Sequence, residues 1–291
     1  SASGGGDATV GVAVAINVAN MNNRATVSGS VEAAGGLVIS ATMTDYGDTE
    51  HTFGATAVSG ASGAPPASSE DNGGFALAVS LGLNIANLDT VALVDTAASI
   101  TVTGGDIEIK AESFGSSNTE ATPSAPVAGG SAGIGISVAI NLVDDIARAE
   151  ISTTADVNIN GANNMSVLAL GGHNMTTLAE AGAGSTGVTV VPAIAIAISN
   201  VDRVARIGGT PADPVISLTG SLTIAGRAPP SENTVITTAK GSADSKGGSA
   251  AVGVAIAVSV GTHNITARLE RNVTAGGAVL IEAVGRSRVS S

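Results

Sequence analysis

The sequence predicts an all-β fold: a repeat β-solenoid of about five units, each roughly 57–67 residues long. Segments in which bulky and small residues alternate with a period of two recur at nearly constant spacing, and no segment has a convincing helical period. A second motif, two short alternating segments joined by a glycine turn, recurs once in each unit. The composition of 44% hydrophobic and 12% charged residues with 39 glycines favours short strands and tight turns, and is the opposite of a disordered chain.

The first motif aligns on five polar anchor residues whose spacings are 67, 57, 58 and 60: Asn17, Asn84, Asn141, Ser199 and Ser259. Three residues after each anchor stands a turn former: Asn20, Asn87, Asp144, Asp202 and Thr262. We therefore predict equivalent strands over 10–19, 75–86, 134–143, 193–201 and 252–260. The array is expected to be continuous over 1–291, with units 7–73, 74–131, 132–191, 192–248 and an incomplete 249–291.

Alternation gives each of these strands a bulky and a small face. In the first strand, Val10, Val12, Val14, Ile16 and Val18 share one face, which we expect to point inward. The opposite face is small in the first and last units: Gly11, Ala13, Ala15, Gly253, Ala255 and Ala257. This small face is either covered by a second sheet of the same molecule or serves as a flat assembly face for another copy.

The polar anchors suggest a structural ladder. Equivalent positions of adjacent coils stack about 4.8 Å apart, so aligned side-chain amides could hydrogen-bond from coil to coil. The alternative is a set of unrelated surface turns.

The second motif has the form V-x-A-G-G-x-V-x-I and contains the pairs Gly35-Gly36, Gly104-Gly105 and Gly276-Gly277, whereas Gly161 and Gly220 lack the second glycine. It resembles the repeats of filamentous-haemagglutinin-like adhesins, and the first motif resembles segments of leukotoxin-like giant bacterial surface adhesins. The resemblance implies a right-handed parallel β-helix, secretion across the outer membrane, and roles in adhesion, biofilm or surface coating. The unit is long for one coil, which leaves two or more coils per unit open.

Charge and hydropathy restrict the partners. A net charge of −12 disfavours nucleic acid and anionic lipid. The most apolar stretches, 188–198 and 250–260, are far shorter than a membrane helix needs, so we expect no membrane insertion. The opening residues do not read as a signal peptide, and we expect an internal stretch of a larger protein located outside the cell or on a bacterial surface. Further repeats of the parent chain or copies of this one are the expected partners, with a cell-surface glycan as another candidate.

Catalytic residues and cofactors are not expected. Ser131 lies in a G-x-S-x-G match, but the match precedes a predicted strand instead of following one, and the chain has no cysteine. His51, His173 and His263 are interpreted as dispersed, solvated loop residues. Calcium is the one ion considered, with Asp144, Asp145, Asp45 and Asp48 as weak candidates that turn capping explains more simply.

We therefore expect a structural segment of a large surface protein, acting as a rigid spacer or as a self-assembling filament or coat element. Two alternatives remain. A specific glycan- or receptor-binding adhesin module would need an exposed patch, for which the insertion at 55–75 is the only candidate. A polysaccharide-active β-helix enzyme is more remote, because the acidic residues are spread thinly and only 1% of residues are aromatic.

Overall fold

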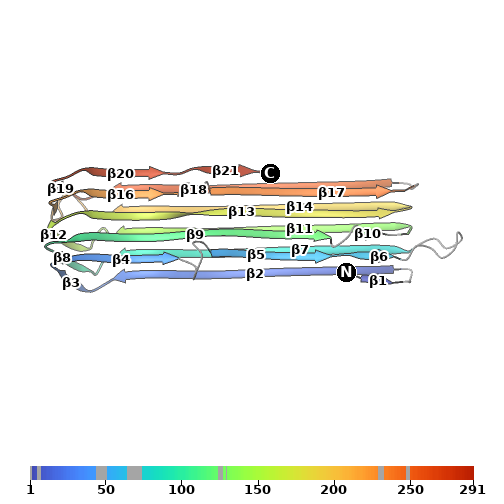
Figure 1. Cartoon of the computed structure of the whole chain (residues 1–291), viewed down its shortest axis with the longest axis horizontal. Coiled ribbons are helices and arrows are strands. Elements are labelled where there is room, and N and C mark those ends of the chain that lie inside the picture. Colours follow the sequence, from blue (N-terminus) through green and yellow to red (C-terminus); the bar gives the residue numbers. More distant parts are fainter. Residues whose placement is uncertain are drawn as a thin grey trace.

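The computed structural model describes residues 2–4, 8–43, 51–63, 74–123, 127–128, 130–228, 233–246 and 250–291. In these ranges every regular element is a β-strand, and neighbouring strands pair in parallel as the chain winds through stacked coils (Figure 1). This confirms the predicted all-β solenoid. No helix in the same ranges could cross a membrane.

One face of the solenoid is a sheet of five strands of 20 residues each, in the order β18-β14-β11-β7-β2. These strands are β2 (Ala8–Val27), β7 (Phe75–Val94), β11 (Ala132–Ile151), β14 (Val188–Ile207) and β18 (Ala250–Leu269). Their first residues stand in register from coil to coil, so one sequence repeat is one coil. The predicted strands were correctly placed but half as long as the real ones, and the predicted boundary at 192 lies inside β14.

The opposite face is a sheet of eleven strands. Some of these strands lie end to end in the same coil, as β4 and β5 do alongside β9. They are β1 (Ala2–Gly4), β4 (Gly36–Met43), β5 (His51–Ser59), β6 (Ala61–Gly63), β9 (Asp106–Pro123), β10 (Val127–Ala128), β13 (Met165–Ser185), β16 (Leu222–Arg227), β17 (Asn233–Ser245), β20 (Val279–Val284) and β21 (Ser287–Ser290). The glycine- and alanine-rich stretch 181–185 is strand within β13.

Five short strands close one end of every coil and form a third sheet, in the order β19-β15-β12-β8-β3. They are β3 (Ser30–Ala33), β8 (Ser99–Val102), β12 (Asp156–Ala162), β15 (Ile216–Leu218) and β19 (Val273–Ala275). The glycine turn follows four of these strands, and in the fifth, β12, Gly161 lies within the strand, which confirms the strand–turn–strand motif. Gly36 and Gly105, the second glycines of their pairs, have φ of 113° and 72°, a conformation that other residues rarely adopt.

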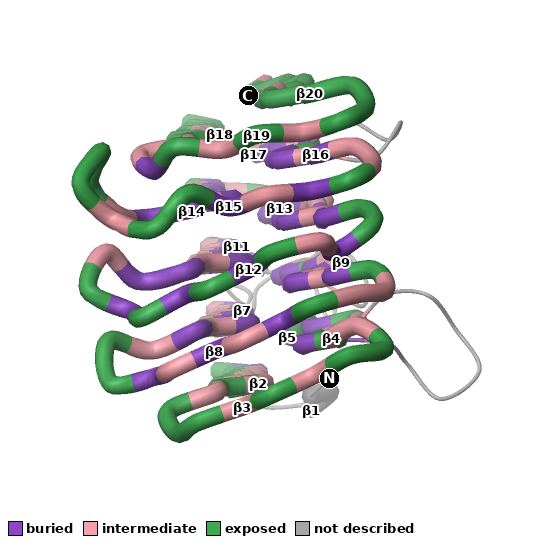
Figure 2. The backbone as a smooth tube through the Cα atoms, turned by 90° about the vertical axis from the view of Figure 1, so that its left-hand side faces the viewer, coloured by how far each residue is buried: buried purple, intermediate pink, exposed green. Residues whose placement is uncertain are grey.

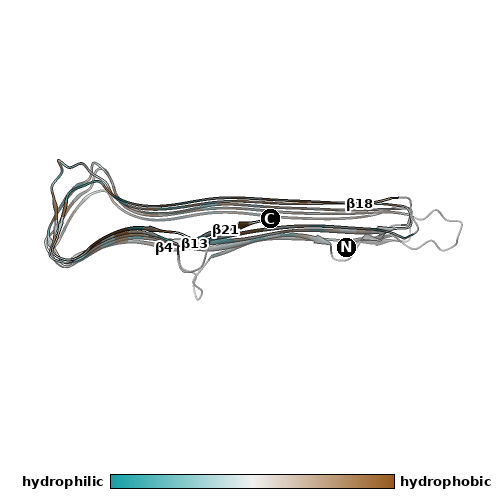
Figure 3. Ribbon diagram, turned by 90° about the horizontal axis from the view of Figure 1, so that it is seen from above, coloured by the Kyte–Doolittle hydropathy of each residue, from teal (hydrophilic) through white to brown (hydrophobic). Residues whose placement is uncertain are grey.

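The interior changes character along the coil. Where the short strands close it, Ile, Val and Leu fill a wide core that includes Ile109, Ile151, Ile159 and Ile207. Toward the other end, the two long faces run close together and enclose mostly alanine (Figure 3). Burial is greatest in the middle coils, and both terminal coils are largely exposed (Figure 2).

Candidate functional site

The small face of the long sheet points inward. Ala139, Ala193 and Ala195 are fully buried against the opposite sheet. The sheets approach so closely that a Cβ on Gly133 or Gly135 would lie 2.7 Å from the carbonyl oxygen of Gly184 or Gly182. Of the two alternatives for the small face, the structure shows packing within one molecule. The terminal strands β2 and β18 also turn their small residues inward, in register with the inward residues of their neighbours. These include the proposed assembly residues Gly11, Ala13, Ala15, Gly253, Ala255 and Ala257.

The bulky residues point outward, so the prediction that they face the core was wrong. Val12 is 64% exposed and Ile16 is 62% exposed. The physical reason is the narrow gap between the sheets, which is filled mostly by Ala with few larger side chains such as Val191. Period two identifies which residues share a face, but it does not say which face is inside.

The outward bulky residues of the five long strands form one surface, which we call the aliphatic face. Each strand contributes five alternate positions, and the strands are in register, so the positions form five rows of five. Every position is Val, Ile or Leu except Pro192; the strands contribute alternate residues of 10–18, 77–85, 134–142, 190–198 and 252–260. No polar or charged side chain interrupts the aliphatic face.

A polar row borders the aliphatic face. Asn87 Nδ2 donates to Asn20 Oδ1 at 2.8 Å, and Asn200 Nδ2 donates to Asp144 Oδ1 at 2.8 Å. Asn20, Asn87 and Asp144 were predicted to end their strands, but all three lie within them. Beyond this row the same outward face carries ion pairs, including Arg206 with Glu150 at 2.6 Å.

The predicted ladder exists in the first three coils, where its side chains point inward. Asn17 Nδ2 donates to Asn84 Oδ1 at 2.6 Å, and Asn84 Nδ2 donates to Asn141 Oδ1 at 2.8 Å. The next position in register is Ala197, which ends the ladder, because the predicted anchor Ser199 pairs with Val143 instead. Ser259 is in register with Ala197 and donates to Thr237 Oγ1 at 2.6 Å.

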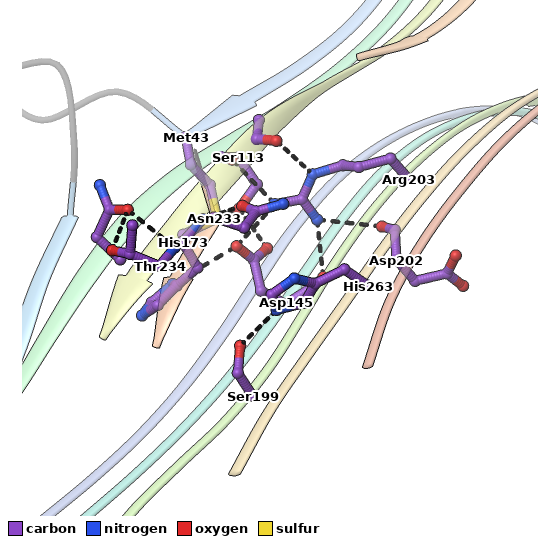
Figure 4. A network of polar contacts seen from close by, with 12 residues as sticks. Met43, Ser113, Asp145, His173, Ser199, Asp202, Arg203, Asn233, Thr234 and His263 are labelled. Carbon is purple, nitrogen blue, oxygen red and sulfur yellow. Dashed lines mark hydrogen bonds and ion pairs between the residues drawn. The ribbon is translucent and has the colours of Figure 1, made fainter. Parts of the chain in front are cut away.

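The structure also contains a buried polar cluster, which we define as Arg203, Asp145, His173 and Ser113 (Figure 4). All four side chains are fully buried. Arg203 on β14 forms an ion pair with Asp145 on β11 at 2.8 Å, and Ser113 Oγ on β9 donates to the other Asp145 oxygen at 2.7 Å. His173 Nδ1 on β13 lies 3.6 Å from Asp145 Oδ2.

Arg203 also joins the two sheets. Its guanidinium donates to the carbonyl oxygens of Gly171 at 3.1 Å and Ser113 at 3.3 Å on the opposite face, and to that of Asp145 at 2.7 Å on its own. Gly171 has φ of 136°, and a Cβ there would collide with the Ser113 carbonyl. Position 171 in β13 is therefore restricted to glycine, and it is one of the positions whose carbonyl oxygen Arg203 contacts on the opposite sheet.

The cluster was missed from the sequence, and two predictions about its members were wrong. His173 was interpreted as a solvated loop residue but lies within β13 in the interior. Asp144 and Asp145 were paired as calcium candidates, but successive strand residues point to opposite faces, so one lies outside and the other inside. Asp45 and Asp48 lie outside the described residues.

The other histidines are in strands as well. His51 begins β5, and His263 lies within β18, where its ring contacts the hydroxyls of Ser199 at 3.2 Å and Ser287 at 2.5 Å. Ser131 directly precedes β11 and does not open a helix. In the described part of the chain, no three His, Asp or Glu side chains gather in a way that could hold a metal ion.

Two pKa values shift in the interior. Burial raises the pKa of Asp145, but Arg203 and His173 outweigh it, so the pKa is held below its ordinary 3.8. Partial burial, with Arg203 and His173 nearby, lowers the pKa of His263 below 6.5. Asp145 is therefore a stable buried anion, and His263 resists protonation in the folded state.

These shifts predict acid sensitivity in two stages. Because folding lowers the pKa of His263, the unfolded chain binds more protons as pH falls below 6.5, and stability decreases there. Stability decreases again below pH 3.8, where protonation of Asp145 is easier in the unfolded chain. Urea denaturation followed by circular dichroism from pH 8 to 3 should show both stages. His263→Gln should remove the first stage and keep the second; an unchanged profile in this variant would contradict the assignment.

Comparison of the chain with protein-family models, with curated proteins and with solved structures finds no match.

Proposed function

We propose that the chain is a structural, non-enzymatic segment of a large secreted or cell-surface bacterial protein, and that it acts as a rigid coat or filament element in adhesion or biofilm. The observation that carries this proposal is the coil-to-coil register of the 20-residue strands, in which backbone groups pair from one coil to the next. The motif resemblance supports the location outside the cell.

The dimensions of a coil favour a coat over a spacer. Adding a coil of 56–67 residues raises the stack by only about 4.8 Å, the spacing of hydrogen-bonded strands. The same coil adds a strand of 20 residues to the five-stranded face, or about 65 Å at 3.3 Å per residue. The chain thus gains lateral surface much faster than it gains height.

The test deletes coils from the parent protein in the cells that produce it. Removing residues 75–131 takes out one coil and leaves Ala132 to pair where Phe75 paired with Ala8. Because an in-register neighbour replaces the lost coil, we expect the shortened protein to fold, reach the cell surface by antibody labelling, and keep cells cohesive. Removing 75–102 alone leaves half a coil and should abolish all three.

A control replaces residues 64–73, within the insertion, with a Gly-Ser linker of equal length. A structural role predicts unchanged cohesion in this variant. Loss of binding to a surface glycan or receptor here, with surface display retained, would favour the adhesin alternative and contradict the structural proposal.

A further inference from the structure

The aliphatic face is unusual for the outside of a protein in both size and uniformity. Its five strands are about 4.8 Å apart, and each strand contributes a segment of nine residues. The aliphatic face therefore covers roughly 700 Å². Monomeric proteins rarely expose contiguous apolar patches larger than a few hundred Å². The face therefore requires an explanation beyond the presence of scattered surface valines.

We propose that the aliphatic face binds the aliphatic face of a second copy of this chain. The inference names the partner surface for the proposed structural role and rests on that role. The area of roughly 700 Å² is close to the ~800 Å² that each partner contributes to a standard stable interface. Two such sheets can pack face to face at about 10 Å, as in a β-sandwich.

Charge and geometry favour a copy of the same chain over a charged partner. The chain carries −12, yet the aliphatic face carries no charge, so two copies can meet there without placing carboxylates in contact. Both copies have the same spacing between strands, because backbone pairing fixes it. Side chains on the strands of one copy can therefore pack between those of the other along the whole face. The polar row at Asn20, Asn87 and Asp144 marks where the interface ends.

The first test measures assembly of the purified chain by sedimentation equilibrium. The wild-type chain, with a monomer mass of 27.8 kDa, should sediment as a dimer. Ile140→Glu places a charge on the aliphatic face of the middle coil and should raise the dimer dissociation constant at least 100-fold. Leu168→Glu is the matched control, because Leu168 points outward from β13 on the opposite face, and it should leave the dimer intact. Raising the salt concentration should tighten the wild-type dimer by screening repulsion between the two acidic copies.

The second test does not depend on a destabilising variant. The chain has no cysteine, so Val138→Cys introduces a single thiol at the centre of the aliphatic face. Any two-fold axis that superimposes the face on itself passes close to this point, so a short bis-maleimide crosslinker that spans the roughly 10 Å between facing sheets should join two copies through their thiols. Ser116→Cys on the opposite face should not crosslink.

A wild-type chain that is monomeric at all concentrations, or an Ile140→Glu variant that stays folded and dimeric, would overturn the proposal. A monomer that binds neutral lipid vesicles through this face would overturn it in favour of a membrane. Each of these results leaves the coil-deletion experiment free to support the structural role, so the two proposals fail separately.

Discussion

Replacing Arg203 with methionine is expected to lower the free energy of unfolding by about 3–5 kcal/mol, because it leaves the Asp145 carboxylate buried without its cation. The two side chains are fully buried and 2.8 Å apart. The variant also loses the hydrogen bonds from Arg203 to four backbone carbonyls in two sheets. Urea denaturation followed by circular dichroism measures the effect.

A paired variant separates charge from packing. Arg203→Met with Asp145→Leu removes both charges and should recover much of the lost stability, since a buried ion pair and an apolar pair are often nearly equivalent. Arg24→Met, which breaks the exposed Arg24–Asp89 pair, is the control and should change stability by less than about 1 kcal/mol. If the double variant is as unstable as the single one, Arg203 stabilises the fold through its carbonyl contacts and not by neutralising Asp145.

Two neighbouring residues of β14 should differ greatly in the stability that they lose on the same substitution. Ala195→Glu is expected to cost roughly 4 kcal/mol or more and to prevent the fourth coil from forming, because the carboxylate would enter a fully buried alanine layer. Ile196→Glu points outward and should cost about 1 kcal/mol. Thermal denaturation of both variants measures the difference. Equal losses, or a larger loss for Ile196→Glu, would show that the bulky face is the core, as the sequence first indicated.

Most of the architecture could be predicted from the sequence, because each repeat contains the same two motifs and each motif corresponds to one part of a coil. The glycine turns of the second motif and the anchors Asn17, Asn84 and Asn141 were placed in the correct register. The fourth anchor was not, since Ser199 resembles the anchors in type but stands two residues beyond the equivalent Ala197. A polar residue within a strand gives no local signal of its register; only the pairing partner does.

Which face of each long strand points into the core could not be predicted from one strand alone. Bulky residues normally face a core, and that rule fails here because the opposite strand is also small where it faces inward, with Ala179, Ala181 and Ala183 on β13. Comparing the two long strands of one coil would have indicated a thin interior. The same comparison would have found the buried cluster: Asp145 and Arg203 occupy positions in phase with inward alanines, where an unpaired charge is not tolerated.

The orientation of the long strands also determines how the molecule would respond to tension. A pull along the stack acts across the strands, in the direction of their hydrogen bonds, so a terminal coil would peel away one bond at a time instead of shearing as a unit. A peeled coil of 56–62 residues extends to about 200 Å at ~3.4 Å per residue, against the ~4.8 Å that it occupied in the stack. Under load such an array would lengthen in large, regular steps while the coils behind the tear remained folded, and would thereby dissipate mechanical work as a shock absorber does.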